Sequence, residues 1–235
     1  MKGYSMSLSI SCRIKAVFFA LAISLPVLLS GCAGLTTTPR DDRLLPRLEN
    51  IAVLPMDRAV TRPGQDRMTC TLSDTVFDVS ETSPAEADAM TRILFGLVEG
   101  DPRFHIVPEK RCVGFLNVFL QEDVRASQIK LIRAFGTELG ADAVLYGKLF
   151  RFEERIGSPY SVERPASIAY TIHLIRVSDG AILWGATFDE TQRPLSENLF
   201  KISLYRKVGM RWLTAEEFAA YALSQNIEDL RKRLP

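Results

Sequence analysis

The segment from Ala166 to Glu190, ASIAYTIHLIRVSDGAILWGATFDE, constrains the fold more than any other part of the chain. Two runs rich in β-branched and aromatic residues flank the sequence Ser178-Asp179-Gly180. Such runs favour β-strands, and Asp-Gly between them is typical of a tight hairpin turn. The sequence therefore predicts a β-hairpin with two long strands.

Three earlier segments also have strand character. Asn50–Met56 is a short apolar run that contains Pro55, Phe104–Pro108 is another, and residues 141–157 begin as a continuous apolar run and then alternate. The alternation is typical of a strand that leaves a core. Residues 58–80 are polar and predict a long loop, with a short hairpin near 69–79.

Helix signals lie between these strands. Ser83 and Glu86 form a capping box with Pro84 at the first helical position, and Gly100 follows the last apolar residue of the stripe. Further helices are predicted over residues 109–121, over 126–139 and, from a second capping box at Thr214 and Glu217, to about Leu234. The predicted fold class is α/β (α+β), in which a mixed sheet with a β-meander packs against helices in a single domain.

The amino-terminal segment predicts export. Ala16–Leu29 is uncharged and mostly apolar but only 14 residues long, which is too short for a helix across a bilayer. With Arg13 and Lys15 before it and small residues after it, the segment is typical of a secretory signal. Leu29-Ser30-Gly31-Cys32 resembles a bacterial lipobox, which implies cleavage between Gly31 and Cys32 and acylation of the Cys32 thiol, with palmitate among its chains. A plain signal peptide with a chance cysteine is the alternative.

The expected organisation is a lipoprotein signal peptide over residues 1–31, a lipidated flexible tether over 32–47 and a periplasmic domain over 48–235. In enterobacterial-type lipoproteins, a residue other than aspartate after the acylated cysteine implies the outer membrane, and here that residue is Ala33. In such an oxidising compartment, Cys70 and Cys112 predict one disulfide. Two free buried cysteines are the alternative.

Charge and motifs exclude several function classes. Residues 1–31 contain three of the 29 basic residues and none of the 28 acidic ones, so the remainder of the chain has a net charge near −2. It therefore lacks the excess of positive charge that is typical of nucleic-acid-binding proteins. The two histidines, His105 and His173, lie in predicted strands and are expected to be structural. The sequence contains no recognised catalytic, phosphate-binding or metal-binding motif. We therefore expect no enzyme activity, no cofactor and no metal.

The strand IAVLPM, a helix, and then ELGADAVLYGKL opening a meander resemble a periplasmic α/β module. This module is found in the amino-terminal domain of TolB, in the curli-secretion lipoprotein CsgG and in LpoB, a lipoprotein that activates a peptidoglycan synthase. The resemblance covers residues 48–200, and Gly140–Gly147 carries most of it. The tail FDETQRPLSENLF resembles a subgroup of bacterial lipoproteins of unassigned function. The resemblance implies a fold and does not choose a function.

Two non-enzymatic functions remain. In the first, a lipid-anchored accessory domain docks on an envelope protein, such as a peptidoglycan-synthesis or transport and assembly complex, through Tyr160, Arg164 and Arg193 in the connections 157–165 and 188–199. The alternative for these segments is that they are ordinary long connections. In the second, the chain is a CsgG-like component of an oligomeric secretion pore, with 168–177 and 181–190 as its lipid-facing hairpin. Homo-oligomerisation is left open in both.

Overall fold

The computed structural model describes residues 44–112, 125–193 and 211–235. Its strands are β1 (Ile51–Val53), β2 (Asp57–Arg58), β3 (Arg67–Thr69), β4 (Val76–Asp78), β5 (Phe104–Ile106), β6 (Ala143–Glu153), β7 (Ile156–Gly157), β8 (Val162–Arg164), β9 (Ser167–Arg176) and β10 (Ile182–Thr191). Its helices are α2 (Pro84–Val98), α4 (Arg125–Leu139) and α6 (Ala215–Arg233).

The main sheet is mixed. Its strand order is β10-β9-β6-β1-β5, and β2 pairs with β6 beyond the end of β1. The strands β6, β9 and β10 are antiparallel neighbours and form a meander, whereas β1 runs parallel to both β5 and β6. This arrangement confirms the predicted fold class, a mixed sheet with a meander in a single domain.

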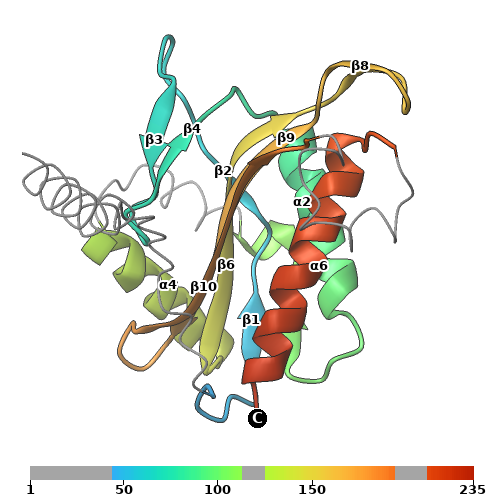
Figure 1. The fold of residues 1–235 in the computed structure, drawn as a ribbon. Helices are drawn as coiled ribbons and strands as arrows, with labels where there is room; N and C mark the ends of the chain where they lie inside the picture. Colours follow the sequence, from blue (N-terminus) through green and yellow to red (C-terminus); the bar gives the residue numbers. More distant parts are fainter. Residues whose placement is uncertain (1–43, 113–124, 194–210) are drawn as a thin grey trace, which may run out of the picture. The chain divides into compact units, whose positions relative to one another are not determined.

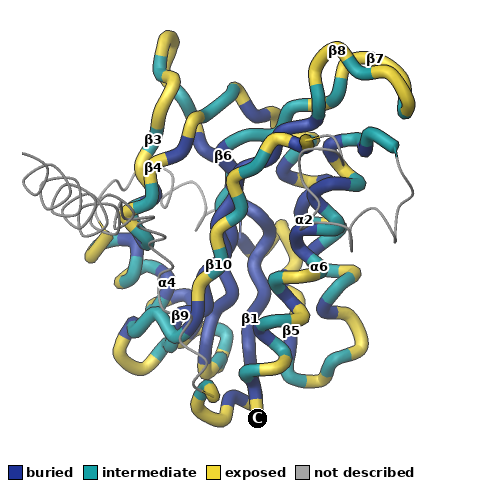
Figure 2. The backbone as a smooth tube through the Cα atoms, in the orientation of Figure 1, coloured by how far each residue is buried: buried dark blue, intermediate teal, exposed yellow. Residues whose placement is uncertain are grey.

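Helices and a small hairpin cover the two faces of the sheet (Figure 1). On one face α2 and α6 pack side by side, and on the other lie α4 and the β3–β4 hairpin. Strand β9 is buried along most of its length (Figure 2). Its alternate apolar side chains belong to the two cores on opposite faces of the sheet. Ile168, Tyr170, Ile172 and Leu174 lie in the core under α2 and α6, and Ala169 and Ile175 in the core under α4.

The predicted local signals recur in the structure. Ser83 caps α2 and Thr214 caps α6, and in each capping box the glutamate three residues on, Glu86 or Glu217, accepts the N–H of the capping residue. In the β9–β10 turn, Gly180 has φ +79°, which favours glycine, and its N–H donates to the carbonyl of Arg176. These contacts lie within a few residues of one another, so the sequence alone can specify them.

Other predictions met a different outcome. Arg58, expected as the start of a loop, forms the short strand β2 with Asp57, against Lys148 and Leu149 of β6. The connection around residue 160 is a small β-hairpin, β7–β8, and not an open loop. Most of the predicted helix 109–121 lies outside the described residues. Within the described ranges, no helix has both the length and the apolar character that a bilayer crossing requires.

Candidate functional site

The β7–β8 hairpin projects from the end of the sheet where β6 leaves the core (Figure 1). Ile156 pairs with Arg164, and Gly157 pairs with Val162 after a bulge. Gly157 has φ +115°, and a Cβ atom on it would lie 2.5 Å from the carbonyl oxygen of Ser161. Only glycine therefore fits this position without moving the hairpin. At the tip, the Ser158 hydroxyl oxygen accepts the N–H groups of Tyr160 and Ser161.

Hydrogen bonds tie this hairpin and the two residues before it to the start of α6 and the segment that precedes it. The N–H of Trp212 donates to the Pro159 carbonyl at 2.7 Å, and the Arg155 guanidinium donates to the Trp212 carbonyl at 3.1 Å. The Glu154 carboxylate accepts the N–H of Ala215 at 3.0 Å. This carboxylate lies at the amino end of α6, where the helix dipole favours negative charge. The hairpin is thus fixed at both its base and its tip.

Gln192, at the end of β10, links the same parts from a buried position. Only 3% of it is exposed. Its side-chain amide donates to the Arg211 carbonyl at 3.2 Å and accepts the N–H of Leu213 at 2.8 Å. Its own N–H donates to the Ala166 carbonyl at 2.9 Å, next to the end of β8. One glutamine therefore joins β10, the β8–β9 connection and the start of α6.

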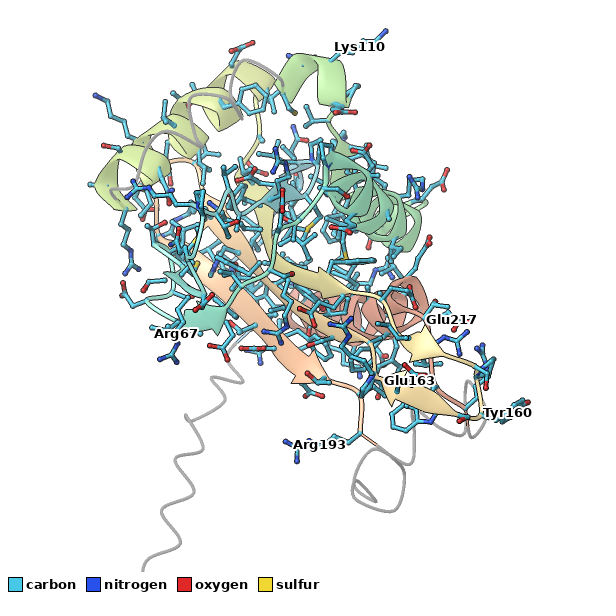
Figure 3. All side chains as sticks on the ribbon, turned by 90° about the horizontal axis from the view of Figure 1, so that it is seen from above. Arg67, Lys110, Tyr160, Glu163, Arg193 and Glu217 are labelled. Carbon is cyan, nitrogen blue, oxygen red and sulfur yellow. The ribbon has the colours of Figure 1, made fainter. Side chains whose placement is uncertain are left out.

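We call the combined surface of residues 156–164, 192–193 and 211–214 the hairpin platform. The three predicted docking residues all lie on it. Tyr160 is at its tip and 83% exposed, Arg164 is exposed on β8, and Arg193 is exposed just beyond β10. Figure 3 shows Tyr160, Glu163 and Arg193 on the same side of the molecule as Glu217, with Arg67 and Lys110 elsewhere. Trp212, which completes the platform, was not predicted. Gln192 lies within the predicted connection 188–199, but its bonds were not predicted.

An ion pair lies beside the platform. Arg211 donates two hydrogen bonds to the Glu217 carboxylate, at 2.9 and 2.6 Å. These bonds hold the pKa of Glu217 below its usual range. They also raise the pKa of Arg211, and the nearby Tyr160 adds to this rise. The Glu217 carboxylate accepts the Thr214 N–H as well, so the pair also fixes the amino end of α6. The platform is therefore rigid and carries charges of both signs.

The predicted Cys70–Cys112 disulfide is wrong for this structure, in which both cysteines are free and buried. Cys70 follows β3 in a turn whose N–H bonds place its side chain toward β9, where Sγ lies 3.7 Å from His173 Nε2 and 3.7 Å from Thr171 Oγ1. Cys112 follows β5 in the chain and lies in the same core under α4 as Cys70 does. The contact that Cys70 makes is with the sheet and not with the second thiol.

The contact of Cys70 with His173 and Thr171 adjoins further buried polar side chains, which were not predicted from the sequence. Tyr146 on β6 donates its hydroxyl to Asp57 Oδ2 at 2.8 Å, and Lys148 Nζ lies 3.8 Å from the same oxygen. Burial raises the pKa of Asp57, although Lys148 and Tyr146 oppose the rise. The alternation of β9 already placed Thr171 and His173 on one face, but no local signal indicated which segment covers them.

The remaining predicted site residues, Gly31 and Cys32, lie outside the described residues, so cleavage and acylation stay predictions. Among the described residues, no group of three or more His, Cys, Asp or Glu side chains could hold a metal ion. An open, polar hollow of about 460 Å³ lies between residues 58–66 and 79–82. It includes none of the predicted docking residues.

No protein-family model and no curated protein match this chain. Solved structures are similar at low identity. A PelC dodecamer from Paraburkholderia phytofirmans is 15% identical with a TM-score of 0.45, over 80% of this chain and 92% of that one. The LpoB C-terminal domain from Salmonella enterica is 12% identical with a TM-score of 0.36, over 63% and 86%. Lipoprotein GNA1162 from Neisseria meningitidis is 12% identical with a TM-score of 0.36, over 69% and 98%. At these values the similarity assigns neither a family nor a function.

Proposed function

We propose that this chain is a lipid-anchored, non-catalytic docking domain of the bacterial envelope, which binds a protein partner through the hairpin platform. The observation that carries the proposal is Tyr160, 83% exposed at the tip of a hairpin whose backbone is fixed by Trp212 and Gly157. A large aromatic side chain held in water on a rigid support is typical of an interface anchor.

The platform has the other properties of a protein interface. Ile156 on the same hairpin is 42% exposed and adds apolar surface. Arg164 and Arg193 are exposed and flank the base, and arginine is enriched at interfaces. Because the bonds of Gln192 and Trp212 already order the backbone, binding would immobilise side chains only, which lowers the entropic penalty of association.

The anchor and the compartment come from the lipobox. Acylation of Cys32 would hold the domain on a membrane, and Ala33 favours the outer membrane with the domain facing the periplasm. The partner class that fits such a position is an envelope complex, in peptidoglycan synthesis, transport or assembly. The structure gives less support to a secretion pore, because the proposed lipid-facing hairpin is β9–β10. Nine of the ten residues of β9 are buried in the two cores.

The experiment begins with a photo-crosslinking amino acid at position 160 in cells, which identifies the bound protein. Its affinity is then measured for the wild type and for Tyr160→Ala with Arg164→Ala. A hot-spot loss of about 2 kcal/mol weakens binding about 30-fold. The thermal unfolding midpoint should change little, because both side chains are exposed.

A matched control uses the other small hairpin, where Val76 is 48% exposed and Arg67 is exposed. Arg67→Ala with Val76→Ala removes the same kinds of group from β3–β4, and it should leave the affinity unchanged. Equal affinity of the platform variant and the wild type would show that the platform is not the binding surface.

A further inference from the structure

Groups that can donate hydrogen bonds surround the Cys70 sulfur. The His173 ring nitrogen Nε2 and the Thr171 hydroxyl lie 3.7 Å from Sγ, and the Ser73 hydroxyl and the Leu72 N–H also reach it. Burial raises the pKa of the Cys70 thiol, but the hydrogen bonds of His173 and Ser73 outweigh it and lower the pKa to about 6. Donors that converge on one sulfur stabilise the thiolate, which is the nucleophilic form of cysteine.

The second ring nitrogen of His173 gives an independent observation. The residue is only 3% exposed, and Nδ1 has no hydrogen-bond partner among the described residues. An unpaired buried polar atom is rare in native proteins and calls for an explanation. Nδ1 faces Gly185 on β10, an exposed residue whose missing Cβ would lie 3.2 Å from it. Glycine at position 185 therefore lets β10 lie close to the ring.

Cys70 lies in the turn between β3 and β4, in the core under α4. Its N–H donates to the Thr75 carbonyl, and the Asp74 N–H donates back to the Cys70 carbonyl. Toward α4 this turn is held by a hydrogen bond from the Thr71 hydroxyl to Gln128 and by an exposed ion pair between Asp74 and Arg125, at 3.2 Å. Exposed pairs contribute only about 0–1 kcal/mol. Exposure of the sulfur therefore requires local opening of residues 70–75, which would also expose the buried side chain of Leu72.

Other titratable groups lie near Cys70 on β6 and β2. From β6, Tyr146 interacts electrostatically with the thiol and donates to the Asp57 carboxyl group. Lys148 lies beside the same carboxyl group. Among these neighbours, His173 is the titratable side chain in hydrogen-bond contact with the sulfur.

We propose that Cys70 is a peroxide-reactive thiol whose thiolate is held by His173. The sulfur attacks one oxygen of a peroxide, an S–O bond forms and the O–O bond breaks. The sulfur loses two electrons and becomes a sulfenic acid, and the departing oxygen leaves as water or an alcohol after taking a proton from His173 Nε2 or from solvent. A small thiol would then displace water from the sulfenic acid and form a mixed disulfide with Cys70. A second molecule of the thiol would attack this disulfide, so that Cys70 leaves in its reduced form and the two small thiols leave as a disulfide.

The first test measures thiol reactivity in the native, full-length protein. Iodoacetamide labelling is followed from pH 5 to pH 9, with each cysteine resolved by peptide mass spectrometry. The Cys70 rate should reach half its maximum near pH 6. Cys112 is an internal reference, because burial raises the pKa of its thiol to about 11, so it should stay unlabelled over this range. A Cys70 midpoint at or above pH 8, or labelling in denaturant only, would overturn the proposal.

The second test removes the histidine. His173→Gln should lower the Cys70 labelling rate at pH 6 about tenfold, since the lost thiolate fraction is partly offset by the higher nucleophilicity of a more basic thiol. Its thermal unfolding midpoint checks that it folds; if it does not, the wild-type pH profile decides. An unchanged rate in a folded variant would show that His173 does not hold the thiolate.

The third test uses the oxidant. Wild-type protein is treated with hydrogen peroxide at pH 7 and then with a dimedone probe, which traps sulfenic acids. The probe should mark the Cys70 peptide, and no mark should appear at residue 70 in Cys70→Ser. The absence of a mark on Cys70 in the wild type would refute oxidation. This outcome leaves partner binding by the hairpin platform unaffected, because the two sites share no residue.

Discussion

At the scale of single residues, the buried Gln192 contributes more to the structure of the platform than any exposed side chain does. Gln192→Leu would leave the Leu213 N–H and the Arg211 carbonyl without their bonds. An unpaired buried group costs about 1–3 kcal/mol, so we expect the free energy of unfolding to fall by about 2–4 kcal/mol. Urea denaturation measures this loss, and hydrogen exchange should rise at residues 211–214.

Gln65 offers a matched control, since its side chain also makes two backbone bonds, to Arg62 and Arg67, but on an exposed loop. Gln65→Leu should change the free energy of unfolding by no more than about 0.5 kcal/mol. Equal losses in the two variants would contradict the structural role given to Gln192.

Asp57 predicts a pH dependence. Because burial raises its pKa in the folded state, the folded protein binds the proton more tightly than the unfolded chain does. The wild type therefore loses stability as the pH rises from about 4 through the folded pKa of Asp57. Asp57→Asn lacks this loss, so its stability relative to the wild type should increase with pH over the same window. Denaturation at a series of pH values checks this, and a constant difference would contradict it.

At the scale of elements, local signals were sufficient where the deciding contacts are local. The boxes at Ser83 and Thr214 specify the starts of α2 and α6 within four residues. The β7–β8 hairpin was missed because its strands are only two and three residues long and have no alternating apolar pattern. Its conformation depends on Trp212, some fifty residues further along the chain.

The Cys70–His173 contact was missed for a related reason. The two residues are 103 positions apart, and the β3–β4 turn has to fold back over β9 before they meet. Counting cysteines in an exported chain favoured a disulfide with Cys112, because cysteine counts carry no information on which side chains a turn brings together. The sequence predicted which residues of β9 share a face of the sheet, but it did not predict which segment covers that face.

The hairpin itself makes a testable element. Gly157→Ala places a methyl group 2.5 Å from the Ser161 carbonyl at a φ of +115°, so the hairpin must change shape. We expect a loss of at least about 1 kcal/mol in stability, together with weaker partner binding. Gly96 in α2 is the control, because an added Cβ there meets nothing within 4 Å. Gly96→Ala should stabilise the protein by about 0.5–1 kcal/mol and leave binding unchanged. Unfolding curves and partner affinity measure both.

At the scale of the whole molecule, the proposed anchor makes a prediction that does not depend on the fold. Cys32→Ala removes the thiol that would be acylated, so the protein should lose palmitate labelling and move from the detergent phase to the aqueous phase. Signal cleavage before residue 32 should also fail. Retention of the label in the variant would contradict lipidation at Cys32.

The two ends of α6 lie at opposite ends of the domain (Figure 1). Its amino end adjoins the hairpin platform, while at its carboxyl end the Leu45 N–H donates to the Arg233 carbonyl and Arg103 reaches the carbonyl of Pro235. A helix of 19 residues is roughly 28 Å long. A fluorescent reporter fused after Pro235 would therefore lie beside the start of the domain and leave the binding surface open. Leu234 is buried, so the linker to such a reporter should begin only after Pro235.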